Sequence, residues 1–137
     1  MASRWEAMDA QPRLGLATLT RSDVPTDPGV YALYRYDERM YVGKASSLRQ
    51  RIWNQHCGRG RVMTGSAMRR NVAQHLGIST ALAIKSGQYQ PTDDEVRHVR
   101  VWMETCHIAW RVCDTDALAA RLERDMKAEF MPTLTRQ

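Results

Sequence analysis

The chain has 137 residues, with 20 lysines and arginines against 15 aspartates and glutamates, and therefore a formal charge of +5. This length fits one domain that buries a core without disulfides or a structural metal. The basic residues are unevenly placed, because residues 49–70 contain six arginines and no acidic residue. Such a block favours a polyanionic partner, although a solvated basic face without a partner would have the same composition.

The cysteines and the distribution of apolar residues indicate the cellular location of the protein. Cys57, Cys106 and Cys113 form no C-x-x-C pair, so the sequence predicts neither a disulfide framework nor a zinc knuckle. Charged residues interrupt the first twenty positions, and no later stretch approaches the roughly 20 apolar residues that a membrane-spanning helix needs. We therefore expect a cytoplasmic protein with reduced thiols and no membrane segment.

The first predicted elements follow a lead-in segment, residues 1–28, which has room for a short helix and ends in the turn-rich SDVPTDPG. Within residues 30–43, side chains on both sides of YDERM follow the alternating pattern of a strand, and YDERM supplies a turn. This pattern predicts an antiparallel hairpin. A helix capped by Ser46 or Ser47 follows, and Gly58 is placed to end it.

The middle of the chain is predicted to be helical. Ser66 is a candidate cap for a second helix, which we expect to end before Gly77. KSGQYQP, residues 85–91, is predicted to be a loop. Thr92 and Glu95 then have the spacing of a capping box, which predicts the start of a third helix.

The last two predicted elements are a strand and a helix. Residues 106–114 alternate as a third strand does, and a final helix is predicted from about Thr115 to Phe130, beyond which Pro132 prevents continuation. The apolar residues that we expect on the buried faces are Ile108, Trp110 and Val112 in the strand and Leu118, Leu122 and Met126 in the helix.

The hairpin and its helix carry side chains suited to phosphate-ester chemistry. Tyr41 begins the second strand, Lys44 leaves it and Arg51 lies one turn into the helix, so the three could converge on one spot. A phenol accepts a proton when nearby cations favour its ionised form, a lysine supplies a point charge, and an arginine holds two phosphate oxygens. Simple strand packing is the alternative for the tyrosines.

These residues resemble the GIY-YIG nuclease superfamily, through GVY at 29–31, YVG at 41–43 and the KASSLRQRI that follows it. The resemblance implies a single α/β domain of the α+β type, with a three-stranded antiparallel sheet flanked by helices. It also implies phosphodiester hydrolysis with one divalent metal held by a glutamate. Residues 58–105 would be a family-variable helical insert.

The C-terminal run LERDMKAEFMPTL is similar to the nuclease module of excision-repair enzymes. It places Glu123 nine residues before Pro132. Asp125 and Glu129 lie about 200° and 240° around the helix from Glu123, so at most one of the three faces a common site. All three border the predicted buried stripe, and only the offset to Pro132 selects Glu123. Thr135 stands where the family commonly has asparagine.

The resemblance implies a role for each residue of the hairpin. Tyr41 would be the general base, and Tyr31 would orient the scissile phosphate unless it is purely structural. Arg51 would stabilise charge on the transition state. Gly29 and Gly43 would permit a close backbone approach or merely tight turns.

Three further residues complete the predicted catalytic set. Lys44 would position the phosphate or lower the pKa of Tyr41, unless it is a solvated strand-end lysine. His56 lies where several branches of the family place a histidine near the leaving group or the water, although it could also be a helix cap or a surface residue. Glu123 would bind Mg²⁺ or Mn²⁺ through oxygen, with water filling most of the shell.

The predicted partner is DNA. The side chains expected to contact its phosphates are Arg49, Arg59, Arg61, Arg69 and Arg70. Because one site cuts one strand, double-strand cleavage would need paired subunits or sequential nicks, and a two-fold homodimer is one such arrangement.

Two other classes of function compete with the endonuclease. One is a catalytically weak or inactive nucleic-acid-binding module of the same fold, which the threonine at position 135 motivates. The other is a metal or redox protein that uses the neighbouring pairs His56-Cys57 and Cys106-His107.

Overall fold

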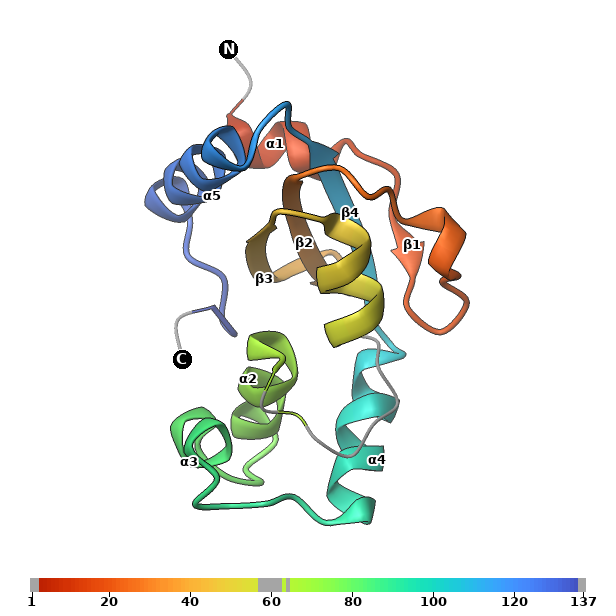
Figure 1. Ribbon diagram of the computed structural model, residues 1–137, viewed down its shortest axis with the longest axis vertical. Helices are drawn as coiled ribbons and strands as arrows, with labels where there is room; N and C mark the ends of the chain where they lie inside the picture. Colours follow the sequence, from red (N-terminus) through yellow and green to blue (C-terminus); the bar gives the residue numbers. More distant parts are fainter. Residues whose placement is uncertain (1–2, 57–62, 64, 136–137) are drawn as a thin grey trace.

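A computed structural model describes residues 3–56, 63 and 65–135 of the chain. Its centre is a four-stranded antiparallel sheet in the order β1-β4-β2-β3 (Figure 1). The strands are β1 (Leu14–Gly15), β2 (Gly29–Arg35), β3 (Glu38–Ala45) and β4 (His107–Val112). The sheet therefore has one strand more than the three predicted, because β1 in the lead-in pairs with β4. Two residues are too few for an alternating pattern to be visible in the sequence.

The predicted hairpin is confirmed as β2 and β3, but its turn is tighter than expected. Tyr36 and Asp37 have φ values of 51° and 66°, so they form a two-residue turn with both central residues in the left-handed region. The strands therefore run up to Arg35 and resume at Glu38. In this register Tyr31 pairs with Gly43 and Leu33 with Tyr41.

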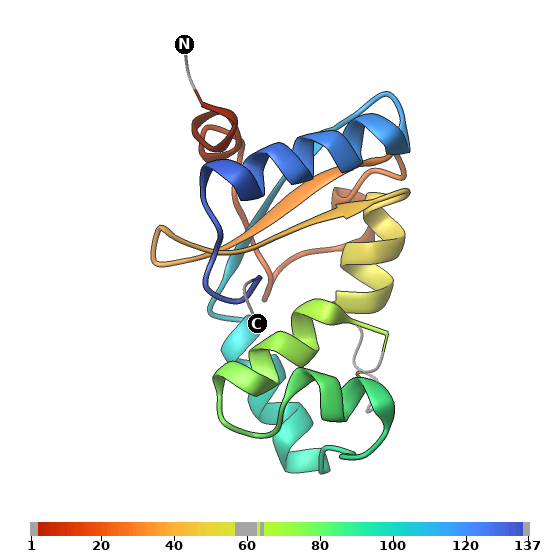
Figure 2. The same cartoon turned by 90° about the vertical axis from the view of Figure 1, so that its left-hand side faces the viewer.

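The sheet separates two hydrophobic clusters. Helix α5 (Asp116–Glu129) and helix α1 (Arg4–Asp9) cover one face, where α5 contacts β2 and β3 and the buried residues include Val30, Ala32 and Val42. The other face carries Tyr31, Leu33 and Tyr41 and packs against the remaining helices. Figure 2 shows α5 on one side of the sheet and the helical middle of the chain on the other. The two tyrosines of the triplets thus face the helical middle of the chain.

The helices of this second face are η2 (Gln50–His56), α2 (Ala67–His75), α3 (Ala81–Ser86) and α4 (Asp93–Met103). Ser66 caps α2 and the capping box of Thr92 opens α4, as predicted. The short α3 was missed, and it includes the first two residues of the predicted 85–91 loop. The predicted helix end at Gly58 lies outside the described residues. No helix in the described part of the chain is long and apolar enough to cross a membrane.

Two of the predicted buried positions are wrong. Leu118 is 47% exposed, and Ala119, Leu122 and Met126 instead form the inner stripe of α5. At about 100° per residue, Leu118 lies about 80° from Met126 around the helix, whereas Ala119 lies only about 20° from it. Val112 is 52% exposed because it is the last residue of β4.

Candidate active site

The two tyrosines of the GVY and YVG triplets lie together on the insert-facing side of the hairpin. Tyr31 from β2 and Tyr41 from β3 are diagonal neighbours across the strand pair. Their ring centroids are 6.2 Å apart with an angle of 26° between the ring planes. Both side chains are buried. The hairpin register therefore brings the two triplets of the sequence to one place.

The glycine of each triplet allows a close approach of other atoms to the strand backbone. A Cβ atom at Gly43 would lie 2.5 Å from Tyr31 Oη, and a Cβ at Gly29 would lie 2.4 Å from the Arg111 carbonyl oxygen. Neither glycine is in a turn, because both are strand residues. The Tyr31 side chain therefore occupies space that only a glycine at position 43 leaves open.

His56 is the last residue of η2 and lies against Tyr31. Its Nε2 is hydrogen-bonded to Tyr31 Oη at 2.7 Å, and its Nδ1 to Ser66 Oγ at 2.6 Å. Element η2 is a π-helix, a form often found at functional sites. Leu48, Ile52 and His56 are all buried at a spacing of four residues. His56 is thus neither a cap nor a surface residue, and only 2% of it is exposed.

Burial keeps the groups of this cluster uncharged at neutral pH. Burial lowers the pKa of His56 to about 3, and the nearby charges of Arg51, Arg69 and Arg70 act in the same direction. Burial raises the pKa of Tyr31 well above its usual value, and it raises that of Tyr41 as well. Because both hydroxyl groups are protonated, a tyrosine here can take a proton from water only if it transfers its own proton to another group.

The charges of two arginines lower the pKa values of the tyrosines. The charge of Arg51, from η2, lowers the pKa of both Tyr31 and Tyr41 against the larger effect of burial. Arg70, from α2, lowers the pKa of Tyr41 in the same way. The structure therefore brings Arg51 to the tyrosines, as predicted, and adds Arg70, which the sequence analysis had placed only among the side chains that contact DNA phosphates.

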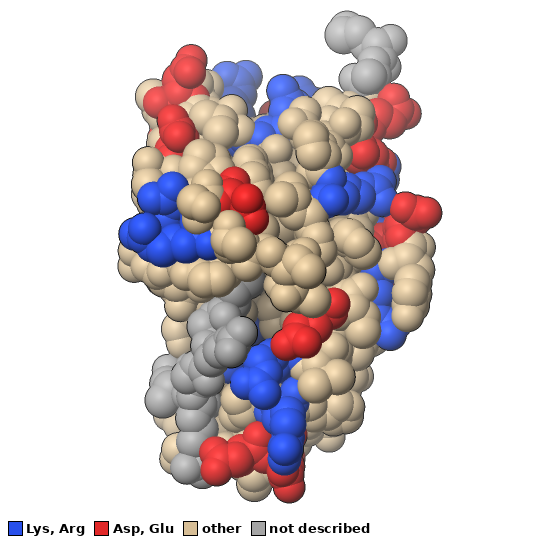
Figure 3. Space-filling model, turned by 90° about the vertical axis from the view of Figure 1, so that its right-hand side faces the viewer, with Lys and Arg blue, Asp and Glu red and all other residues tan. Residues whose placement is uncertain are grey.

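Of the other arginines predicted to contact DNA, Arg49 and Arg69 lie within the described residues. Arg69 is buried, and Arg49 donates from its Nε to the Val24 carbonyl oxygen at 2.8 Å, which ties η2 to the lead-in segment. Arg59 and Arg61 lie outside the described residues. On the face shown in Figure 3, basic side chains form separate groups with acidic ones between them.

Lys44 points away from the tyrosines. Residues three apart on a strand face opposite sides of the sheet, so Lys44 lies on the face opposite Tyr41. Its Nζ lies 3.6 Å from Asp116 Oδ1 at the start of α5, and Ser46 Oγ donates to the same oxygen at 3.1 Å. The predicted convergence of Lys44 with Tyr41 and Arg51 is therefore not seen.

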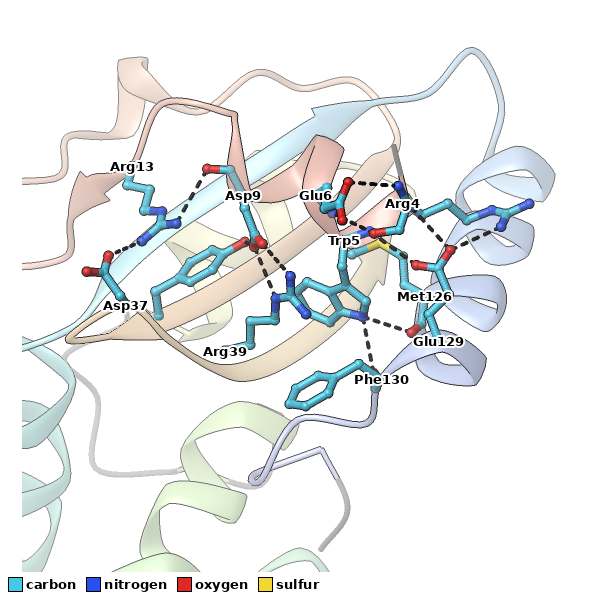
Figure 4. A network of polar contacts seen from close by, with 12 residues as sticks. Arg4, Trp5, Glu6, Asp9, Arg13, Asp37, Arg39, Met126, Glu129 and Phe130 are labelled. Atoms are coloured by element: carbon cyan, nitrogen blue, oxygen red, sulfur yellow. Dashed lines mark hydrogen bonds and ion pairs between the residues drawn. The ribbon is translucent and has the colours of Figure 1, made fainter. Parts of the chain in front are cut away.

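The three acids of α5 have different surroundings. Glu129 accepts hydrogen bonds at 3.2 Å from the backbone N–H groups of both Arg4 and Trp5, at the start of α1 (Figure 4). Asp125 also faces α1, because its Oδ2 lies 3.5 Å from Arg4 Nε. Both carboxylates are therefore engaged in holding α1 on the domain.

Glu123 instead lies on the side of α5 nearer to the tyrosines. Its charge raises the pKa of both Tyr31 and Tyr41, and its Oε1 lies 3.4 Å from Lys127 Nζ. The Glu123 side chain is 19% exposed, so solvent reaches it.

A divalent cation at Glu123 would have this one carboxylate as its protein ligand and would keep most of its water. Among residues 3–56, 63 and 65–135, no group of three or more His, Cys, Asp or Glu residues could hold a metal ion. A single solvent-accessible carboxylate offers one oxygen ligand and leaves room for water in the rest of the shell. Mg²⁺ is often bound in this way, through one or two carboxylates together with substrate phosphates.

The C-terminal segment adds to the outer edge of β3, beside Tyr41. Thr135 Oγ1 accepts a hydrogen bond from the Val42 N–H at 3.0 Å, and the Leu134 N–H donates to the Met40 carbonyl oxygen at 2.9 Å. Asn71 Nδ2 of α2 donates to the Leu134 carbonyl oxygen at 2.9 Å. Thr135 thus makes a polar contact in the middle of the YVG triplet, where the family commonly has asparagine.

The predicted pairs of histidine and cysteine do not form a metal site in the described part of the chain. Both ring nitrogens of His56 are already hydrogen-bonded. Cys106 is a buried free thiol with a raised pKa of about 11, caused chiefly by burial. Cys57 lies outside the described residues. The structure therefore lends no support to the metal or redox protein.

Comparison with known proteins identifies a family. A family model described as a GIY-YIG catalytic domain matches residues 30–137, which include the hairpin, the helical middle of the chain and α5. No curated protein matches the chain.

Proposed function

The chain belongs to the GIY-YIG catalytic-domain family, and on that premise we propose that it is a divalent-metal-dependent endonuclease that hydrolyses DNA phosphodiester bonds. The family resemblance predicted from the two triplets is confirmed, and it suggests a nuclease. The single observation that carries the proposal is the 2.7 Å contact between Tyr31 Oη and His56 Nε2, within reach of the charges of Arg51 and Glu123.

The proposed proton path begins at the water that attacks phosphorus. As the water oxygen bonds to phosphorus, its O–H bond breaks and the proton moves to Tyr31 Oη. The proton of Tyr31 moves to His56 Nε2, and the bond between phosphorus and the leaving oxygen breaks. The leaving oxygen then takes a proton from solvent. A neutral imidazole is the acceptor that this path needs, and the lowered pKa of His56 keeps the ring neutral at pH 7. The same lowered pKa makes the ring a weak base, so the path requires the bound phosphodiester to raise it.

This path favours Tyr31 as the general base, whereas the sequence predicted Tyr41. Both tyrosines have a raised pKa, so neither is ionised before the reaction. Tyr31 has a neutral nitrogen within hydrogen-bonding distance, and this contact supports its assignment. Tyr41, at the outer strand, would then orient the water or the phosphate. The negative charge of the bound phosphodiester would help the transfer, because a nearby anion raises the pKa of an imidazole.

The charged residues around the tyrosines complete the proposed site. Arg51 and Arg70 would stabilise the charge that develops on the phosphate oxygens. Glu123 would hold Mg²⁺ or Mn²⁺, and the bound ion would supply positive charge at the phosphate and help to orient the water. Lys44 has no part in the proposed proton path, because it lies on the other face of the sheet.

Plasmid nicking tests the proposal. The protein should nick supercoiled plasmid in the presence of Mg²⁺ or Mn²⁺, and a chelator should stop the reaction. Glu123→Gln should abolish nicking, whereas Asp125→Asn is the matched control, because Asp125 faces α1 rather than the tyrosines. Intact plasmid with both metals at several pH values would leave the nucleic-acid-binding module as the remaining function.

The threonine at position 135 motivated the inactive module, but its hydroxyl accepts the Val42 N–H, next to Tyr41 in the chain. Position 135 therefore still offers a polar side chain to β3, and its change from asparagine does not by itself argue against a nuclease. Double-strand cleavage would still need a second site, and we propose a homodimer only for that case.

A further inference from the structure

Ser66 hydrogen-bonds both to the start of α2 and to the last residue of η2. It precedes α2, the first helix of the insert, and its Oγ accepts the Arg69 N–H at 3.1 Å as an N-cap does. The same Oγ lies 2.6 Å from His56 Nδ1. Ser66 is 2% exposed, so water has little access to this contact. The sequence indicated only the helix cap.

The hydrogen atoms of this cluster can be assigned from the proton path. His56 is neutral, so one ring nitrogen carries a hydrogen and the other accepts one. Tyr31 can pass its proton to Nε2 only if Nε2 is unprotonated, and the hydrogen must then be on Nδ1. Ser66 Oγ can accept both the Nδ1–H and the Arg69 N–H, because a hydroxyl oxygen has two lone pairs.

We propose that Ser66 is a positioning residue that holds His56 in the tautomer with a free Nε2, and so couples the first helix of the insert to proton transfer at Tyr31. The partner of one ring nitrogen of a histidine sets which nitrogen carries the proton. The inference rests on the proposed nuclease activity, but the tautomer itself is a property of the free protein.

Loss of the Ser66 hydroxyl would leave the Nδ1–H without its partner in a buried position. The ring could then adopt the other tautomer, in which Nε2 donates to Tyr31 Oη and cannot accept its proton. Outer partners that fix the tautomer and orientation of a histidine at metal sites typically contribute about 10- to 100-fold. We expect a loss of this size in turnover, with little change in KM.

The test separates the two contacts of Ser66. Ser66→Gly removes the hydroxyl, yet glycine is nearly as good an N-cap. Ser66→Thr keeps a hydroxyl and should restore turnover. The matched control is Thr80→Gly, because Thr80 caps the neighbouring α3 by accepting the Ala83 N–H at 3.1 Å and is exposed.

Two measurements are made on each variant: kcat and KM for plasmid nicking, and the ¹⁵N spectrum of the His56 ring in the free protein. The proposal expects an Nδ1-protonated His56 in the wild-type protein, a changed tautomer balance and lower kcat in Ser66→Gly, and neither change in Thr80→Gly. An Nε2-protonated wild-type ring, or an unchanged ring and kcat in Ser66→Gly, would overturn it. If the wild-type protein does not cut DNA, the proposed function fails, and the spectra alone still decide the role of Ser66.

Discussion

A buried neutral histidine should make the stability of the domain depend on pH. The pKa of His56 is lowered to about 3 in the folded protein, against 6.5 for the ordinary group. The unfolded chain therefore binds more protons below pH 6.5, and the free energy of unfolding falls as the pH falls. Between pH 7 and pH 5 the linkage relation gives a loss of about 2 kcal/mol from His56 alone.

The assay is urea unfolding of the wild-type protein and of His56→Gln at both pH values. Glutamine keeps a donor and an acceptor but does not titrate, so the variant should lose about 2 kcal/mol less than the wild type between pH 7 and pH 5. Carboxylates contribute equally to both proteins and cancel in the comparison. His98→Gln, at an exposed position of α4, is the matched control. Identical losses in wild type and His56→Gln would refute the buried neutral imidazole.

Two other predictions concern the neighbours of the tyrosines, and a third concerns DNA binding. Gly43→Ala should displace Tyr31 from His56, because the new Cβ would lie 2.5 Å from Tyr31 Oη, and unfolding by urea should show a loss of about 1–3 kcal/mol together with lost nicking. Thr135→Val should destabilise by about 1 kcal/mol through the orphaned Val42 N–H in the same urea assay, whereas Thr135→Asn should not. DNA affinity should fall steeply with salt in a filter-binding titration, and a flat response would remove phosphate contacts from the account.

Local patterns in the sequence were enough to predict much of the fold. The hairpin, the strand β4 and the capping box of Thr92 depend on residues within a few positions of one another, so alternation and cap spacing reveal them. Strand β1 and helix α3 have two and six residues, too few for a periodic pattern. Leu118 was misplaced because a spacing of four, repeated twice, drifts away from the buried face of a helix.

The site was harder to predict because its contacts depend on how separate elements pack against one another. The contact of Ser66 with His56 depends on where α2 packs against η2, and no local signal in the sequence reports that packing. Asp125 and Glu129 could be separated from Glu123 only after α1 was seen against α5. The position of Lys44 was predictable, however, since a three-residue offset from Tyr41 already places it on the opposite face of a strand.

The most direct test of the central claim compares Tyr31→Phe with Tyr41→Phe in single-turnover cleavage of DNA with Mg²⁺. General-base catalysis contributes about 10²- to 10⁴-fold, and only the tyrosine that exchanges a proton loses that factor when its hydroxyl is removed. The contact of Tyr31 with His56 predicts that Tyr31→Phe loses this factor and that Tyr41→Phe loses much less. The reverse order would contradict the proton path and return the role of general base to Tyr41.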